Sequence, residues 1–132
     1  MLNFKRVVLL SILLPYTSYA ETVPDFFQGV ITYMDHLKSC VPYTFRYQNP
    51  FMPDAVSQNV IRGRSGNHCL VTMQTGPYTW DCSFSPEAIS AMTGDAKYSD
   101  ARSHTLSGSS NDPSSQYLRQ ECTFMVNGKL EN

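Results

Sequence analysis

The most constraining feature of this chain is a pair of alternating segments between residues 66 and 84, GNHCLVTMQTGPYTWDCSF, with one cysteine in each. Alternation of polar and apolar side chains with a period of two is typical of half-buried β-strands. The Gly76-Pro77 break between the segments indicates a hairpin. Cys69 and Cys82 each share a strand face with larger apolar residues, so both thiols are expected to point into the core.

Two registers of this hairpin are compatible with the sequence. A four-residue loop, residues 74–77, would set Cys69 directly opposite Cys82, whereas a two-residue turn at Gly76-Pro77 would place the two cysteines on a diagonal. Directly opposed disulfides must meet tight distance limits. We therefore favour bridges that leave the hairpin, while a direct bridge between Cys69 and Cys82 stays open as an alternative.

Four cysteines, Cys40, Cys69, Cys82 and Cys122, predict two disulfides with three possible connectivities. The favoured pairs are Cys40 with Cys69 and Cys82 with Cys122. The chain has no C-x-x-C pair and its cysteine spacings match no zinc module, so neither a metal site nor a cofactor is expected. His36 and Cys40, one helical turn apart, are the alternative metal ligands, but this alternative requires a free thiol.

Residues 1–20, MLNFKRVVLLSILLPYTSYA, have the layout of a secretory signal peptide. Lys5 and Arg6 precede an apolar run, residues 7–14, and Ser18-Tyr19-Ala20 forms an A-x-A-like cleavage site. The run is shorter than the roughly 20 apolar residues that a membrane-spanning helix needs. We therefore expect an exported protein, periplasmic or extracellular, in which disulfides form and persist.

The mature chain, residues 21–132, is expected to form a single domain without a transmembrane segment. It carries eight Lys and Arg against eleven Asp and Glu, which gives a net charge of −3 with neutral histidines. This mild acidity argues against nucleic acid as a partner.

Outside the hairpin, residues 23–39 carry a wide apolar face at helical spacing and predict an N-terminal helix. Strands are predicted at residues 43–47 and 57–63. A closing strand is expected from Cys122, with Leu118 on its inner face. The fold class is therefore α+β: an N-terminal helix packed on an antiparallel sheet of four to five strands, stapled by disulfides.

Two further segments complete this arrangement. Ser85-Pro86-Glu87 combines an N-cap serine, a proline at the first helical position and an acidic first turn, so a short helix is predicted over residues 86–93. Residues 94–115 are the most polar part of the chain and are predicted to be a mobile loop.

No sequence motif assigns a catalytic residue. A G-x-S-x-G elbow, a phosphate-binding glycine loop and an H-E-x-x-H motif are all missing from the sequence. An enzyme is therefore not the favoured interpretation. A small secreted hydrolase with a site at His68 or His104 stays open as the alternative, and a structural component of an envelope assembly is a third hypothesis.

Two features point to binding. Arg62, Arg64 and His68 flank a glycine-containing turn that could hold an anion, although a solvated hairpin turn is the simpler interpretation. Tyr78 and Trp80 belong to a set of closely spaced aromatic residues that would form a binding patch if they are exposed, or core filling if they are not. We expect a protein that binds a protein, a glycan or an anionic ligand, as an inhibitor, an accessory or a host-directed factor.

Overall fold

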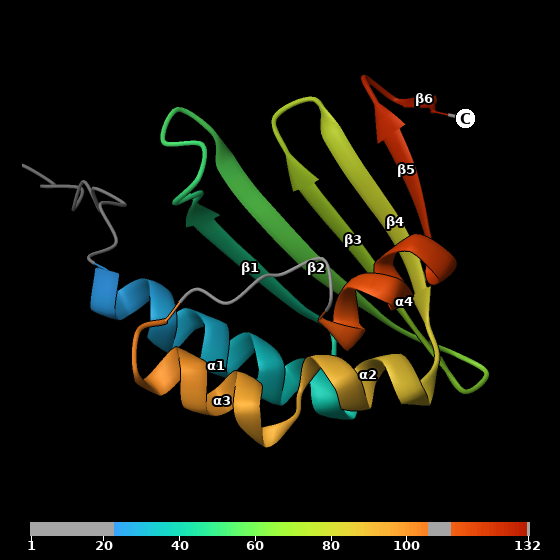
Figure 1. The fold of residues 1–132 in the computed structure, drawn as a ribbon. Coiled ribbons are helices and arrows are strands. Elements are labelled where there is room, and N and C mark those ends of the chain that lie inside the picture. The colour runs from blue at the N-terminus through green and yellow to red at the C-terminus, as the bar shows by residue number, and fades with distance from the viewer. Residues whose placement is uncertain (1–22, 106–111, 132) are drawn as a thin grey trace, which may run out of the picture.

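A computed structural model describes residues 23–105 and 112–131 of the chain (Figure 1). These residues form one antiparallel sheet in which the strands are neighbours in the order of the sequence. The strands are β1 (Tyr43–Gln48), β2 (Val56–Ser65), β3 (His68–Thr75), β4 (Tyr78–Phe84), β5 (Cys122–Val126) and β6 (Lys129–Leu130). The helices are α1 (Val23–Ser39), α2 (Pro86–Met92), α3 (Asp95–Arg102) and α4 (Pro113–Glu121).

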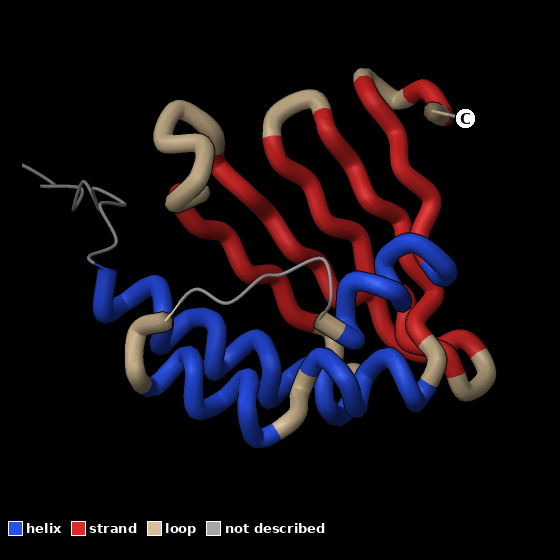
Figure 2. The backbone as a smooth tube through the Cα atoms, in the orientation of Figure 1, coloured by secondary structure: helices blue, strands red, loops and turns tan. Residues whose placement is uncertain are grey.

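The helices lie against one face of the sheet and cover mainly one end of it (Figures 1 and 2). The helix α1 packs on β1, α2 contacts β3 and β4, and α4 contacts β4 and β5, whereas α3 lies beside α1. At the opposite end of the sheet the β1–β2 loop and the β3–β4 turn extend beyond the helices. The sheet therefore has a helix-covered half and an open half.

The strand pairing arranges the helix-facing side chains in rows that cross the sheet. The row nearest the centre of the covered half is Tyr43, Ile61, Val71, Cys82 and Cys122; the next is Phe45, Asn59, Met73, Trp80 and Phe124; the outermost is Tyr47, Ser57, Thr75, Tyr78 and Val126. Ile61 and Val71 are at most 1% exposed, whereas Tyr78 at the open end is 40% exposed. Along β3 and β4, burial thus decreases from the covered half to the open half.

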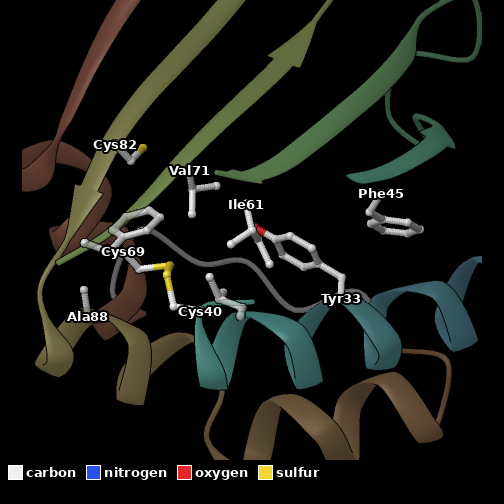
Figure 3. Packing of buried hydrophobic residues seen from close by; sticks show 10 residues of the cluster. Tyr33, Cys40, Phe45, Ile61, Cys69, Val71, Cys82 and Ala88 are labelled. Atoms are coloured by element: carbon white, nitrogen blue, oxygen red, sulfur yellow. A yellow bond between two sulfur atoms is a disulfide. The ribbon is translucent and has the colours of Figure 1, made fainter. Parts of the chain in front are cut away.

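The main core lies between α1, α2 and the covered half of the sheet (Figure 3). Ile61, Val71 and Phe84 are its largest apolar side chains among those that are less than 2% exposed. Leu37 of α1 and Ala88 of α2 close this core from the helix side. The alternation along β3 and β4 supplies these inward residues, while the residues between them face solvent.

A smaller core joins α1 to α3. Phe27 and Met34 of α1 pack with Tyr98 and Ala101 of α3, and all four are buried. The Tyr98 hydroxyl donates a hydrogen bond to the Asp35 carboxylate over 2.8 Å. Burial and this hydrogen bond raise the pKa of Tyr98 to about 12. The phenol therefore stays neutral and continues to donate its hydrogen bond to Asp35.

Two disulfides fix the end of α1 and the strand β5 to this core. Cys40 bonds Cys69 and Cys82 bonds Cys122, which are the pairs favoured by the sequence. Cys40 has a positive φ of 51° directly after α1, and the Val41 amide donates to the His36 carbonyl over 2.9 Å. This helix ending places the Cys40 sulfur against β3.

The structure settles the hairpin register and extends the strand count. The turn has two residues, because Thr75 pairs with Tyr78 and Val71 pairs with Cys82. Cys69 is therefore opposite Phe84 instead of Cys82, as the two-residue alternative required. The helix–sheet architecture of the α+β class is confirmed, with six strands where four to five were expected, because the short strand β6 adds to β5.

The prediction of a loop over residues 94–115 was wrong where the structure describes helices. The helix α3 occupies Asp95–Arg102, and α4 begins at Pro113. Leu118 consequently lies on α4 and not on the closing strand. Few apolar residues mark α3, since only Tyr98 and Ala101 are buried, so its helical period was weak in the sequence. Residues 1–20 and 106–111 lie outside the described residues.

Gly29 allows α1 to approach β1 closely, and replacing it with alanine tests this contact. A Cβ atom at position 29 would lie 2.4 Å from Cε2 of Phe45. We expect Gly29→Ala to lower the free energy of unfolding by about 1–3 kcal/mol despite the better helix propensity of alanine. Urea denaturation measures this loss. The matched control is Gly94→Ser at the N-cap of α3, where a Cβ has ordinary contact distances and no loss is expected.

Candidate functional site

The open half of the helix-facing side of the sheet is the first part of the candidate site. We call it the open-sheet surface, and its residues are Met73, Thr75, Tyr78, Trp80, Phe124 and Val126. Each is exposed or half-buried, in contrast to the buried row below it. Tyr78 and Trp80, both predicted site residues, lie on this surface. The surface joins β3, β4 and β5 only because the pairing aligns residues from distant parts of the sequence.

Aromatic rings form a short stack across the open-sheet surface. The Phe124 ring lies 4.6 Å from the Trp80 ring and 6.0 Å from the Tyr78 ring, centroid to centroid. Trp80 also packs against the main core, which fixes its position from below. Such a stack offers apolar area at little entropic cost, because the rings are already ordered before a ligand arrives.

A second feature of the open end is the β1–β2 loop, residues 49–55, which we call the Phe51 loop. Its tip presents Phe51 and Met52, which are 76% and 40% exposed. The Asn49 side-chain oxygen accepts hydrogen bonds from the backbone amides of Phe51 and Met52 over 2.8 and 3.1 Å. Backbone bonds between Asn49 and Ala55 and between Ala55 and Met52 close the loop. The loop is therefore braced while its apolar tip remains in solvent.

Asn49 also ties the Phe51 loop to the sheet. Its side-chain amide donates to the Ser57 hydroxyl over 2.8 Å, and that hydroxyl lies 2.6 Å from the Thr75 hydroxyl. Ser57 is fully buried. This chain of polar contacts connects the loop to β3, beside the open-sheet surface. The sequence contained Asn49-Pro50 as a turn signal, but nothing in it indicated these partners.

An aromatic cavity lies next to the open-sheet surface on the same face of the sheet. Its volume is about 280 Å³, and α1, β1, β2 and α3 contribute most of its lining. Phe26, Tyr33, Phe45 and Tyr47 are part of that lining, and their rings contact one another at centroid distances of 4.7 to 6.3 Å. Asn59 lines the cavity and pairs with Met73 of the open-sheet surface, so the two features are adjacent.

The polar groups of this cavity are neutral or paired. Burial raises the pKa of Tyr33 well above its usual range, and burial likewise raises the pKa of Tyr47, whose hydroxyl interacts with Ser57 and Asn59. Lys97 at the rim forms an ion pair with Asp112. These groups therefore offer hydrogen bonds without a free cation, and the acidic residue Asp100 also lines the cavity.

The predicted arginine turn is divided between the two faces of the sheet. A bulge between Ile61 and Gly63 shifts the register of β2, and Gly63 has a φ of 121°. Arg62 faces the solvent side, where its guanidinium donates to Asp81 over 2.7 Å. Arg64, opposite Cys69, faces the helices and donates to the Ser39 carbonyl over 3.4 Å. The two guanidinium groups therefore do not converge.

The histidines are also separated from one another. His68 is half-buried at the start of β3, directly after the turn that joins β2 to β3. His36 stacks on Tyr43 at 4.1 Å and its Nδ1 lies 2.8 Å from the Thr32 carbonyl oxygen. His104 stacks on Phe27 at 4.9 Å. The alternative metal pair is excluded in this structure, because Cys40 is bonded to Cys69.

The ion pair between Lys97 and Asp112 joins α3 to α4 and gives a pH-dependent contribution to stability. Lys97, together with the Ser114 amide, holds the pKa of the Asp112 carboxyl below its usual value of 3.8. A depressed pKa stabilises the fold at pH values above about 4, and this contribution is lost as the pH falls through the lower value of the folded state.

We therefore expect Asp112→Asn to flatten the decrease of stability between about pH 5 and pH 2, since the ionising group is removed. Asparagine can still cap α4 by accepting from the Ser114 amide, as Asp112 does over 3.0 Å. Asp112→Ala removes the cap as well, and should cost about 0.5–2 kcal/mol more. Urea denaturation at several pH values measures both effects, and equal pH slopes for wild type and Asp112→Asn would contradict this assignment.

The described residues contain no cluster of three or more histidine, cysteine or acidic side chains suited to a metal ion. In the same residues, no helix is long and apolar enough to cross a membrane. Comparison of the chain with models of protein families, with curated proteins and with solved structures finds no match. The candidate site is therefore the open end of the sheet and the cavity beside it, identified by geometry alone.

Proposed function

We propose that this protein is exported and acts by binding a protein partner through the open end of its sheet. The open end consists of the open-sheet surface and the Phe51 loop. Two disulfides fit an extracellular or periplasmic protein. The role of such a protein would be that of an inhibitor, an accessory or a host-directed factor.

The observation that carries this proposal is the braced exposure of Phe51. A phenylalanine that is 76% exposed costs solubility. Here the loop that presents it is held by side-chain and backbone hydrogen bonds of Asn49. An ordered apolar tip binds with a smaller entropic loss than a flexible one, which is typical of interface anchors.

Other exposed apolar residues at the same end support a protein partner. Val56 begins β2 beside the Phe51 loop and is 52% exposed, and Leu130 on β6 is 66% exposed. The Asn127 amide donates to the Pro77 carbonyl over 2.9 Å, so the β5–β6 turn lies beside the β3–β4 turn. Aromatic and apolar residues with a polar surround are the composition of protein interfaces.

An anionic ligand is less well supported by the geometry. Arg62 and Arg64 lie on opposite faces, and Arg62 is already paired with Asp81. An anion held by both side chains would require the bulge at Gly63 to be removed. A glycan would use the aromatic stack but not the exposed tip of the Phe51 loop.

Site-specific photo-crosslinking tests the proposal. A benzophenone side chain is placed at position 51 or 78, at the open end, and in matched controls at Thr44 or Gln58, on the solvent side of β1 and β2. The exported protein is irradiated in the culture that produces it. We expect one discrete covalent adduct from positions 51 and 78 and none from the controls.

A second set of variants asks whether the adduct depends on the apolar tip. Phe51→Ser in the chain carrying the crosslinker at position 78 should reduce the adduct by at least about tenfold, the equivalent of one apolar anchor. Adducts of equal yield from all four positions, or none from any of them, would refute binding at the open end.

A further inference from the structure

We propose that the aromatic cavity between α1 and the sheet is a separate binding site for one small, uncharged molecule that contains an aromatic ring. This site does not depend on the protein partner proposed above. Its evidence is the shape, lining and charge of the cavity.

The size of the cavity limits the ligand. A volume of about 280 Å³ holds about nine groups of the size of a water molecule or a methylene. This is at the lower end of small-molecule sites, and it corresponds to one or two fused or linked rings. A folded peptide or an oligosaccharide would be too large.

The lining determines the apolar part of the ligand. Phe26, Phe45 and Tyr47 form one connected set of rings, in which Phe45 and Tyr47 stack at 4.7 Å with an interplanar angle of 26°. Val30 and Met34 of α1 add aliphatic surface. A planar ring can pack against such rings with both its faces and its edges, so aromatic ligands gain more contact here than flexible chains.

The polar groups determine the charge of the ligand. Tyr47 and Asn59 offer a hydroxyl and an amide on the sheet side of the cavity. The cation of Lys97 is bound to Asp112, and Asp100, an acid, also lines the rim. A charged ligand would lose its hydration without a free counter-ion among these groups, which is costly in an apolar site.

Two probes with the same two-ring skeleton test this inference. Naphthalen-2-ol is uncharged at neutral pH, and naphthalene-2-sulfonate carries a sulfonate in place of the hydroxyl. Isothermal titration calorimetry measures the binding of each. The mature, oxidised protein should bind one equivalent of the uncharged probe saturably, and should bind the sulfonate at least about tenfold more weakly.

Variants then locate the probe. Val30→Trp fills the cavity from α1, and Ser114→Trp fills it from α4. If one of these variants does not fold, the other still tests the cavity. Each should weaken binding of the uncharged probe by at least about tenfold. Circular dichroism identifies any variant that has lost its fold.

The control is Phe51→Ser at the open end. It should leave probe binding within about twofold of wild type while it reduces the adduct formed by a crosslinker at position 78, so the two proposals can fail separately. Probe binding that is lost in this control, or retained in both folded tryptophan variants, would overturn the cavity assignment. Equal or tighter binding of the sulfonate would overturn the requirement for an uncharged ligand.

Discussion

Replacing Phe84 with alanine is expected to lower the free energy of unfolding by about 3–5 kcal/mol. Phe84 is 1% exposed and lies at the end of β4, directly opposite Cys69 and within the same core as Ala88. Removing its ring leaves a cavity that the disulfide at Cys69 prevents from collapsing freely. A domain of this size has only about 5–15 kcal/mol in total, so the midpoint of urea denaturation should fall steeply.

Phe124→Ala is the matched control for this prediction. Phe124 is on the same face of the sheet but in the open half, where it is half-buried. Its replacement should cost clearly less stability, while it should weaken the adduct formed by a crosslinker at position 51, because the Phe124 ring stacks on Tyr78 in the open-sheet surface. Equal losses of stability in the two variants would contradict the division into a covered and an open half.

Removing the disulfide between Cys82 and Cys122 is the second change with a large expected effect. The double variant Cys82→Ala, Cys122→Ala opens a loop of 40 residues. In the chain-entropy model this loop is worth about 4 kcal/mol. The 29-residue loop closed by Cys40 and Cys69 is worth about 3.5 kcal/mol in the same model. Urea denaturation under non-reducing conditions measures each loss.

The two disulfide variants should differ in what they disturb locally. Cys122 begins β5, so losing its bridge should loosen Phe124 and the open-sheet surface. Cys40 directly follows α1, so losing its bridge should loosen α1 and the cavity. Amide hydrogen exchange distinguishes these regions. A double variant within about 1 kcal/mol of wild type would show that its disulfide does not support the fold.

The alternation around Cys69 and Cys82 was sufficient to predict the hairpin and the inward thiols, and the apolar face of residues 23–39 added the helix that gives the α+β class. The period of two is a local property, and the sequence displays it directly. The Ser85-Pro86 signal likewise predicted α2, where the Ser85 hydroxyl accepts from the Ala88 amide over 3.2 Å. The same type of signal precedes α4 at Asp112-Pro113 and could have predicted that helix.

The candidate site was harder to predict because it depends on pairings between distant residues. Tyr78 and Trp80 were identified, but their partner Phe124 comes from β5, 44 residues after Trp80 in the sequence. The bulge at Gly63 reversed the direction of Arg64, since one extra residue moves a side chain to the other face. The exposure of Phe51 could not be inferred from the sequence, because a phenylalanine side chain is at least as common in a protein core as on a surface.

The cavity could not be predicted from the sequence for the same reason, because it depends on how distant elements pack together. Its wall is made by α1, whose apolar face was evident in the sequence, and by β1, whose aromatic residues alternate. Gly29 permits the close approach of these two elements, and that role is visible only when Phe45 is in place. Empty space between packed elements has no sequence signature of its own.

Hydroxyl-radical footprinting tests most directly the claim that the open end of the sheet is an exposed recognition surface. In the isolated, oxidised protein, Phe51, Met52 and Tyr78 should be oxidised readily by the radicals and Phe84 should be protected. In the culture where the protein is produced, oxidation at Phe51 and Tyr78 should fall at least about fivefold, as expected for burial at an interface, while solvent-side residues such as Thr44 keep their rates. Protection of Phe51 and Tyr78 in the isolated protein, or unchanged rates in its natural surroundings, would contradict the account.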